Sequence, residues 1–288
     1  MDNSPLLGRR VEYPTRRDPL LLRVVERQEN RRALGIAPAL FRGFDAWHAR
    51  EAGFITARGL PVNGILKIVY PADTPLIIES KSLKLYLNSL NMEPFGDTPR
   101  EGIPLFLSAA REDISGALQS PVRLALFTRP PRAPLPFDFG DDYRLLERNV
   151  ARTPFTLYRE CPDLLLDAPR PGGSLRARTH LLRSNCKITG QPDWGSLFVR
   201  LTASRLPSPL SLLRYIVSLR AENHFHEEIC ETIYKRLHDA FAPRELAVTC
   251  LYTRRGGIDI CPSRASHPGL LPALLADHRR LTRPTFQQ

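Results

Sequence analysis

Two stretches of this chain, one in each half, form a weak internal repeat. Gly64-Ile-Leu-Lys-Ile is followed by Tyr86-Leu-Asn-Ser-Leu, and Gly195-Ser-Leu-Phe-Val is followed by Tyr215-Ile-Val-Ser-Leu. Because the spacing between glycine and tyrosine differs by only two residues, a single short deletion relates the copies. Chance similarity between apolar strands is the alternative. If the repeat is real, the chain holds two related strand–helix modules in tandem rather than one large sheet.

Local patterns place strands and one long helix in these two halves. Apolar and β-branched runs predict strands over 64–70, 122–127, 177–183, 196–202, 246–253 and 257–261. Apolar residues at helical spacing, with acidic residues early and basic residues late, predict a helix over 225–241. A shorter helix is expected near 45–51. The length of 288 residues suits two domains, and the proline-rich stretch 129–136 marks their seam. We therefore expect modules over 1–135 and 136–288.

The net charge of +11 comes almost entirely from arginine, because the chain has 36 arginines and five lysines. The arginines are scattered rather than gathered in one stripe, so direct nucleic-acid binding is not favoured. No apolar run approaches the roughly 20 residues of a membrane-spanning helix, and the first residues lack an apolar signal segment. These observations predict a cytoplasmic protein without membrane contact. The five cysteines form no close pair, which indicates neither a disulfide framework nor a structural zinc site.

Three segments could carry chemistry, and the first runs from Leu76 to Ser89. It places Ser80, Lys81, Ser82 and Lys84 beside a carboxylate in a chain that otherwise avoids lysine. Such a cluster suits a phosphate or another anionic ligand group. The alternative is an ordinary solvated helix start, with Ser80 or Ser82 as the cap and the lysines outside.

The second segment, 182–196, contains Cys186 next to Lys187. A neighbouring cation favours the thiolate, which is the nucleophilic form. A turn at Gly190-Gln191-Pro192 could fold Asp193 back toward the sulfur as a proton shuttle. The alternative is a structural cysteine.

The third segment, 221–228, opens the predicted helix with two histidines and several carboxylates. His224 and His226 are two residues apart and do not share a helical face, so we expect no metal site. A glutamate such as Glu227 at a helix start is instead suited to accept two hydrogen bonds from a guanine-like edge, while His226 handles a proton.

Together these segments closely resemble the NADPH-dependent 7-cyano-7-deazaguanine reductases, the nitrile reductases of the queuosine pathway, in their long two-module form. The family signature Glu-Ser-Lys-Ser-x-Lys-Leu-Tyr stands at 79–86 and Ser-Asn-Cys-x-Ile-Thr-x-Gln-Pro-Asp-Trp-Gly at 184–195. Phe-His-Glu stands at 225–227 and Tyr-Thr-Arg-Arg-Gly-Gly-x-Asp-Ile at 252–260. Lys187, Gly190 and Cys261 depart from the pattern without removing a functional group.

The resemblance implies an α+β fold of two tandem tunnelling-fold (T-fold) modules, antiparallel sheets with helices packed on one face. The lysine signature lies in the first half of this chain, whereas Cys186, Asp193 and the Phe-His-Glu segment lie in the second. Neither half should therefore work alone, and we expect the site where the modules meet. A homodimer is a further implication.

The resemblance also implies the reaction: reduction of the nitrile of 7-cyano-7-deazaguanine to a primary amine with two NADPH. Cys186 would form a covalent thioimide, and Asp193 would move protons with the help of His226. The remaining roles are binding the substrate (Ile78, Glu79, Ser80, His226 and Glu227) and binding NADPH (Ser80, Lys81, Arg255 and Gly256), with no metal. Two alternatives are a zinc-free pterin or cyclohydrolase-type enzyme of the same fold and a basic tRNA-binding protein.

Overall fold

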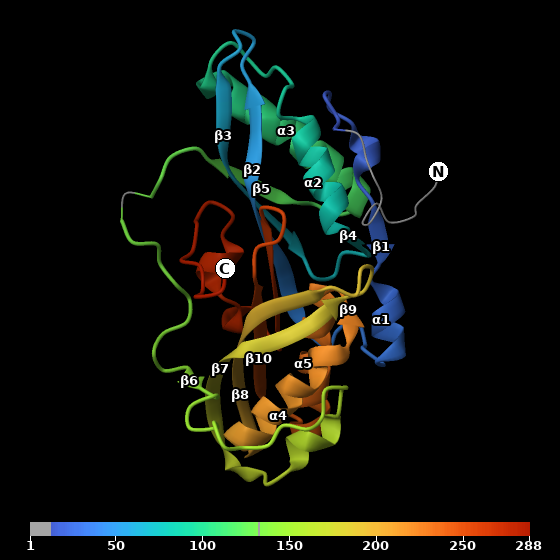
Figure 1. Ribbon diagram of the computed structural model, residues 1–288, viewed down its shortest axis with the longest axis vertical. Coiled ribbons are helices and arrows are strands. Elements are labelled where there is room, and N and C mark those ends of the chain that lie inside the picture. The colour runs from blue at the N-terminus through green and yellow to red at the C-terminus, as the bar shows by residue number, and fades with distance from the viewer. Residues whose placement is uncertain (1–12, 132) are drawn as a thin grey trace.

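One nine-stranded sheet runs through the computed structural model, which describes residues 13–131 and 133–288 (Figure 1). Its strands, in spatial order, are β5 (Arg123–Phe127), β3 (Pro61–Pro71), β2 (Arg42–Ile55), β11 (Ile258–Ala265), β10 (Glu245–Tyr252), β8 (Pro192–Leu206), β7 (Arg170–Cys186) and β6 (Arg144–Leu145), with β9 (Asn223–His224) paired to β7. A separate two-stranded sheet joins β1 (Val24–Glu26) to β4 (Leu76–Ile78).

Six α-helices are interleaved with these strands in the described residues. They are α1 (Gln28–Ala33), α2 (Ser80–Ser89), α3 (Pro99–Leu118), α4 (Pro209–Ser218), α5 (His226–Phe241) and α6 (Ala273–Ala276). Short 3-10 turns are η1 (Pro19–Leu21), η2 (Pro162–Leu166), η3 (Leu219–Ala221) and η4 (Pro268–Leu270). The expected helix over 225–241 and all six expected strands are therefore confirmed in type, with boundaries that shift by a few residues.

The expectation that two modules would take the place of one large sheet was wrong in one respect, because a single sheet runs through both halves. Strand β11 of the second half pairs antiparallel with β2 of the first half, from Ile258 opposite Ala49 to Ala265 opposite Arg42. Each half would otherwise leave a row of unpaired backbone groups along one edge, which is costly when buried. The continuous sheet removes both edges at once and brings the two halves together.

The repeat read from the sequence is also a repeat of structure. The order β2–β3–α2–α3–β5 recurs as β7–β8–α4–α5–β10, and the strands lie in the matching spatial orders β5-β3-β2 and β10-β8-β7. Both hairpins shift register next to the pair that contains the repeated glycine: between Ala49 and Ala52, which pairs with Gly64, and between Thr179 and Leu182, which pairs with Gly195. Chance similarity does not explain a shared irregularity of this kind.

The short helix expected near 45–51 was also wrong, because these residues form the middle of β2. Phe44 and Ala46 pack into the core on one face of the sheet, while Trp47 and Ala49 pack into the core on the other. A strand buried on both faces shows no alternation of apolar and polar residues, so the sequence lacks the signal that distinguishes a strand from a buried helix.

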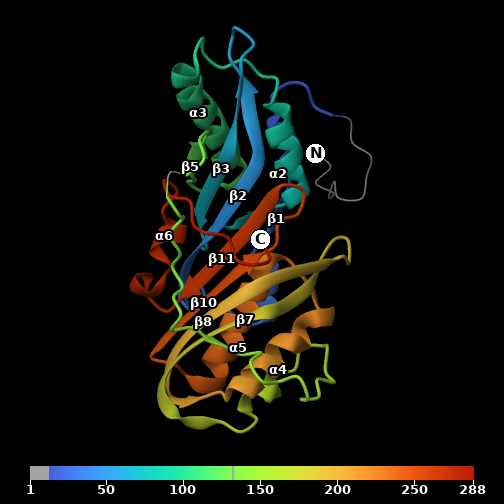
Figure 2. The same ribbon diagram turned by 60° about the vertical axis from the view of Figure 1, so that its left-hand side comes forward.

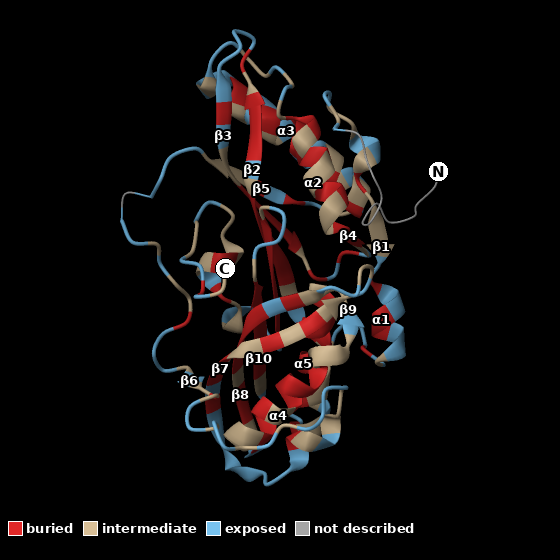
Figure 3. Ribbon diagram, in the orientation of Figure 1, coloured by how far each residue is buried: buried red, intermediate tan, exposed pale blue. Residues whose placement is uncertain are grey.

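The sheet separates two layers. Helices α2 and α3 and helices α4 and α5 pack on one face over two apolar cores, one for each half. The other face is covered by the connection after β5 and by the C-terminal segment, through Phe139 and Leu275. Figures 1 and 2 show this connection in green and the C-terminal segment in red, and Figure 3 shows the buried central strands. Among the described residues, no helix is both long and apolar enough to cross a bilayer.

Candidate active site

A cavity of about 250 Å³ lies on the helical side of the sheet, where the two halves meet. It is walled by residues of both halves, as expected from the division of the motifs between them. Every residue that the sequence singled out for the site lines it: Ile78, Glu79, Ser80, Lys81, Cys186, Asp193, His226, Glu227, Arg255 and Gly256.

The start of α2 forms one wall. Glu79 is the N-cap, and its carboxylate accepts hydrogen bonds from Lys81 N at 3.1 Å and Ser82 N at 2.7 Å. The sequence had offered Ser80 or Ser82 for this capping position. Because the glutamate holds the first turn, Ser80 and Lys81 lie at the positive end of the helix dipole, beside the cavity.

Cys186 lies at the end of β7, and its backbone is held from two sides. Its N–H donates to Gln191 O at 2.8 Å and its C=O accepts from Gly190 N at 3.0 Å. Gly190 adopts a positive φ of 66°, which closes the turn that the sequence predicted. On the other side Cys186 pairs with His224 of β9. The thiol is partly exposed and unbridged, so it is available to a ligand in the cavity.

Asp193 is the first polar side chain after this turn and is nearly fully buried. The Arg255 guanidinium contacts its Oδ1 atom, and His226 Nε2 lies 3.7 Å from the same atom. A carboxylate between a permanent cation and an imidazole can exchange a proton with either the imidazole or a ligand.

His226 begins α5 and packs edge-on against Tyr252, with ring centroids 4.1 Å apart. Burial lowers the pKa of His226, an effect that the Asp193 carboxylate opposes and the Arg255 charge reinforces. The imidazole is therefore neutral at pH 7, and it can donate or accept a hydrogen bond.

Glu227 is 1% exposed, and its Oε1 atom has no hydrogen-bond partner. Burial raises the pKa of Glu227 to about 8, helped by the nearby Asp45 carboxylate, while Arg27 and Arg264 act in the opposite direction. An orphaned, buried carboxyl oxygen is costly unless a ligand satisfies it. Glu227 is thus prepared for a partner that the folded chain does not supply.

Glu228 joins the cysteine segment to α5. It accepts hydrogen bonds from Lys187 Nζ at 3.1 Å, His224 Nδ1 at 3.2 Å and Phe225 N at 3.0 Å. Although burial acts to raise the pKa of Glu228, these bonds bring it below its usual range. Since the Lys187 ammonium lies against Glu228, its charge is matched by this carboxylate instead of being left to act on the adjacent thiol.

Of the other residues that line the cavity, Trp47 and His224 received no role from the sequence, and Lys84 was named only within the cluster suited to an anionic ligand group. Trp47 was hidden by the wrong helix assignment, and its Nε1 donates to Tyr70 OH at 3.0 Å. Lys84 lies one helical turn after Ser80 and Lys81, so it shares their face of α2 and reaches the cavity with them. His224 pairs with Cys186 across a contact between segments far apart in the sequence, which leaves no local pattern.

Comparison with known proteins connects this cavity to a class of enzyme. A family model described as "Nitrile reductase, 7-cyano-7-deazaguanine-reductase N-term" matches residues 13–126, and one described as "QueF-like protein" matches residues 192–268. These matches define the class as nitrile reductases.

The relatives narrow the class. A protein named NADPH-dependent 7-cyano-7-deazaguanine reductase from Acinetobacter baumannii (strain AYE) is 37% identical over 268 residues, 93% of this chain and 95% of the relative. The protein of the same name from Bordetella pertussis (strain Tohama I) is 37% identical over 284 residues, 95% of this chain and 97% of the relative. The chain belongs to the family of NADPH-dependent 7-cyano-7-deazaguanine reductases.

A solved structure titled as the apo form of the archaeosine synthase QueF-Like is also similar, at 18% identity and a TM-score of 0.29. The match covers 33% of this chain and 92% of that chain. A likeness of this size carries no argument about the fold.

Proposed function

We propose that this chain reduces the nitrile of 7-cyano-7-deazaguanine to the primary amine of 7-aminomethyl-7-deazaguanine, in queuosine biosynthesis. Family membership and the names of its relatives support the reaction class. The single structural observation that carries the proposal is that a partly exposed thiol, Cys186, shares one cavity with the orphaned carboxyl oxygen of Glu227.

Cys186 is the proposed nucleophile. A nitrile is a poor hydride acceptor, and addition of the sulfur to its carbon gives a covalent thioimide with a more electrophilic C=N bond. The nitrile nitrogen takes up one proton as the C–S bond forms. After reduction of that carbon, the C–S bond breaks, the thiolate leaves, and an imine remains for the second reduction. NADPH supplies the two hydrides, one for each reduction.

Asp193 and His226 are the proposed proton carriers. Asp193 follows the turn that ends at the nucleophile, and His226 lies 3.7 Å from its Oδ1 atom. A proton leaving the Cys186 thiol can pass to Asp193 and from there to the nitrogen of the substrate. The protons consumed by the two reductions come from solvent: the neutral His226 can accept one and, as the imidazolium, pass it to Asp193.

Glu227 is the proposed anchor of the base. Glu227 lines the same cavity, and a carboxylate with an unsatisfied Oε1 atom suits the adjacent N–H groups of a guanine-like edge, which present two donors side by side. His226 adds a hydrogen bond beside it, and Ile78, Glu79 and Ser80 form the rest of the base pocket.

The residues around the start of α2 fit the phosphates of NADPH. The helix N-terminus, Lys81 and Arg255 present positive charge to the cavity. Gly256 has a positive φ of 56°, and a Cβ there would come within 3.3 Å of the Lys84 side chain. The glycine therefore lets the chain pass close to the lysine, and Ser80 adds a hydroxyl donor.

The test of the reaction is its stoichiometry. With 7-cyano-7-deazaguanine limiting, we expect two NADPH to be oxidised for each nitrile consumed, and 7-aminomethyl-7-deazaguanine to appear by mass spectrometry. Consumption of one NADPH per nitrile, or of none, would contradict the proposed four-electron reduction.

The raised pKa of Glu227 predicts a pH dependence. At neutral pH most of the free enzyme carries a protonated Glu227. The O–H group of this carboxyl is itself a hydrogen-bond donor, so it meets the N–H donors of the substrate unfavourably. Ionisation near pH 8 gives the carboxylate that accepts them. We expect kcat/KM to rise about tenfold per pH unit below this value and to level off above it. Glu227→Gln should lose this limb of the profile; an unchanged profile in that variant would exclude Glu227 as its source.

The division of the chain into modules, its oligomeric state and its location are part of the same proposal. We propose that each half is a T-fold module, with the boundary at 135/136, because the order of elements repeats on either side of it. A homodimer follows from the resemblance alone. The cytoplasm is the proposed location, since all five cysteines are free, as in a reducing compartment.

A further inference from the structure

An exposed tryptophan, Trp194, lies on the opposite face of the sheet from the candidate active-site cavity. Side chains alternate along β8: Leu197 and Val199 pack into the core under α4 and α5, whereas Phe198 packs into the core on the other face. Asp193 lines the cavity, so its neighbour Trp194 points to the face that carries Phe198. Trp194 is 41% exposed, although tryptophan is on average a highly buried residue.

Two arginines flank the indole ring of Trp194. The Cζ atom of Arg183 lies 5.7 Å from the ring centroid, and that of Arg220 lies 5.2 Å from it. Arg183 is opposite Trp194 in the pairing of β7 with β8, and its guanidinium donates a hydrogen bond to the carbonyl of Arg220 in η3. These three residues, the tryptophan platform, therefore form one cationic and aromatic surface at the end of the sheet.

The two guanidinium groups of the platform lack the carboxylates that accompany other arginines of the same strand pair. Arg176 and Arg200 lie opposite each other in β7 and β8, and each pairs with a carboxylate. In the part of the chain that the structure describes, the contacts of Arg183 and Arg220 include no aspartate or glutamate. Burial and the charge of Arg183 lower the pKa of Arg220. An anion bound between the two groups would offset their mutual repulsion.

We propose that the tryptophan platform binds a phosphorylated purine nucleoside. Indole and guanidinium planes are surfaces on which a base can stack, and guanidinium groups donate paired hydrogen bonds to phosphate oxygens. A free phosphate would leave the indole ring without a contact, and a neutral aromatic molecule would leave both charges unmatched. A ligand that joins a purine ring to a phosphate satisfies both needs. The inference does not rest on the reaction proposed above.

Adenosine 5′-monophosphate (AMP) is the probe, because it joins a purine ring to one phosphate and has no nicotinamide. Trp194 is one of two tryptophans in the chain, and the other, Trp47, is nearly fully buried. We expect AMP to quench the tryptophan fluorescence of the full-length protein in a saturable way, and Trp194→Phe to remove this signal. Adenosine and inorganic phosphate, which each carry half of the chemistry, should bind at least about tenfold more weakly.

Equilibrium dialysis of labelled AMP tests the two arginines without relying on fluorescence. Arg183→Met and Arg220→Met should each lower the affinity about tenfold, because each removes charged hydrogen bonds to the phosphate. Arg176→Met is the matched control, since its guanidinium is already paired with Asp142. This variant should change the affinity by no more than about twofold.

Two sources supply this chemistry, the adenosine end of NADPH and a separate nucleotide, and competition distinguishes them. If the adenosine end of NADPH occupies the platform, AMP should raise the apparent KM for NADPH, and Arg183→Met should raise it in the absence of AMP. If a separate nucleotide is the ligand, AMP should bind with the same affinity whether or not NADPH is present.

Several results would overturn the proposal. They are quenching that does not saturate, quenching that survives in Trp194→Phe, and equal AMP affinity in Arg183→Met and Arg176→Met. If the variants fail to fold, photo-crosslinking of 8-azido-AMP to the wild-type protein decides. Label on the tryptic peptides 179–183 or 215–220, neither of which lines the cavity, supports the platform. Label confined to residues that line the cavity excludes it.

Discussion

Cys186→Ala is expected to abolish the covalent adduct and lower kcat/KM by roughly 10⁴-fold or more, as the loss of an enzyme nucleophile does. Incubation of the wild-type protein with 7-cyano-7-deazaguanine in the absence of NADPH should add the full mass of the nitrile to the protein, because thioimide formation is an addition without a leaving group. Peptide mapping should place that mass on the peptide that contains Cys186.

Cys161 provides the matched control. It is free and partly exposed like Cys186, but it lies before η2 and outside the cavity. Cys161→Ala should form the adduct and turn over at the wild-type rate. The mechanism fails if the wild type forms no adduct, or if the adduct survives in Cys186→Ala.

The candidate site could be predicted from the sequence because its residues lie in short, recognisable segments. The turn at Gly190 is local, and so is the helix that begins at His226, so both follow from neighbouring residues. Which segments meet at one cavity does not follow from local pattern. The roles of Cys186, Asp193 and Glu227 rest on resemblance and remain predictions, although the structure brings all three together.

The sheet could be predicted only in part. Each hairpin joins strands close in sequence, and the internal repeat marks both hairpins. The pairing of β2 with β11 joins residues more than 200 positions apart, such as His48 and Asp259. No local periodicity records such a contact. Because this pairing buries β2 on both faces, it also removed the alternation that would have identified the strand.

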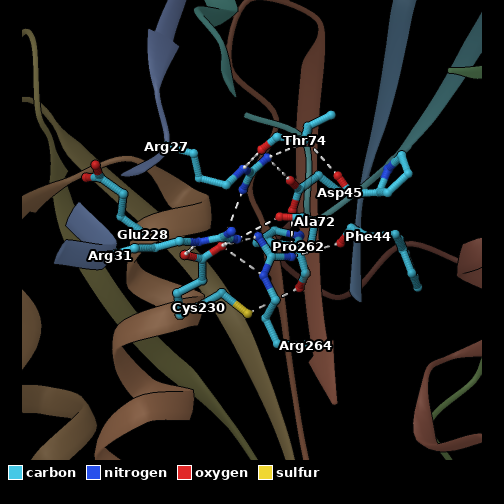
Figure 4. Close-up of polar contacts among 12 residues, drawn as sticks. Arg27, Arg31, Phe44, Asp45, Ala72, Thr74, Glu228, Cys230, Pro262 and Arg264 are labelled. Carbon is cyan, nitrogen blue, oxygen red and sulfur yellow. Dashed lines mark hydrogen bonds and ion pairs between the residues drawn. The ribbon is translucent and has the colours of Figure 1, made fainter. Parts of the chain in front are cut away.

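The sequence predicted least about the charged side chains that are buried where β2 and β11 pair. Arg27, Asp45, Glu231 and Arg264 are each at most 1% exposed. Arginine is rarely so buried, and nothing in the sequence marks these positions as buried. Figure 4 shows how the side chains converge from α5, β2, β11 and the segment before α1. The cluster also includes Arg31, which donates to Glu231 Oε2 at 2.8 Å.

Each member of this cluster depends on the others for its charge. Three guanidinium groups surround two carboxylates, and the arginines lower the pKa of Glu231 to about 2, although burial acts to raise it. Two of these arginines, Arg27 and Arg264, also limit the rise in the pKa of Glu227, one helical turn earlier. The buried charges where β2 and β11 pair therefore connect the packing of the two halves to the protonation of Glu227, the proposed anchor of the substrate.

Arg264→Met is expected to lower the free energy of unfolding by about 3 to 5 kcal/mol, because it leaves buried carboxylates short of a partner. Arg264 donates to Asp45 Oδ1 at 2.8 Å, to Glu231 Oε1 at 3.0 and 2.8 Å, and to the Phe44 carbonyl at 3.1 Å. Arg27 still binds Asp45 Oδ2, and Arg27 and Arg31 still bind Glu231, but Asp45 Oδ1 loses the hydrogen bond from Arg264. The loss corresponds to a fall in Tm of roughly 10 °C.

Arg214→Met is the matched control for this variant. Arg214 pairs with Asp167 at 3.2 Å, and both side chains are partly exposed, at 28% and 56%. Loss of such a surface pair should cost no more than about 1 kcal/mol. Thermal and urea unfolding of both variants provides the comparison. Equal Tm values would show that the cluster at the β2–β11 junction contributes no more to stability than a surface ion pair. A large fall confined to Arg264→Met would show that joining the halves into one sheet depends on these buried charges.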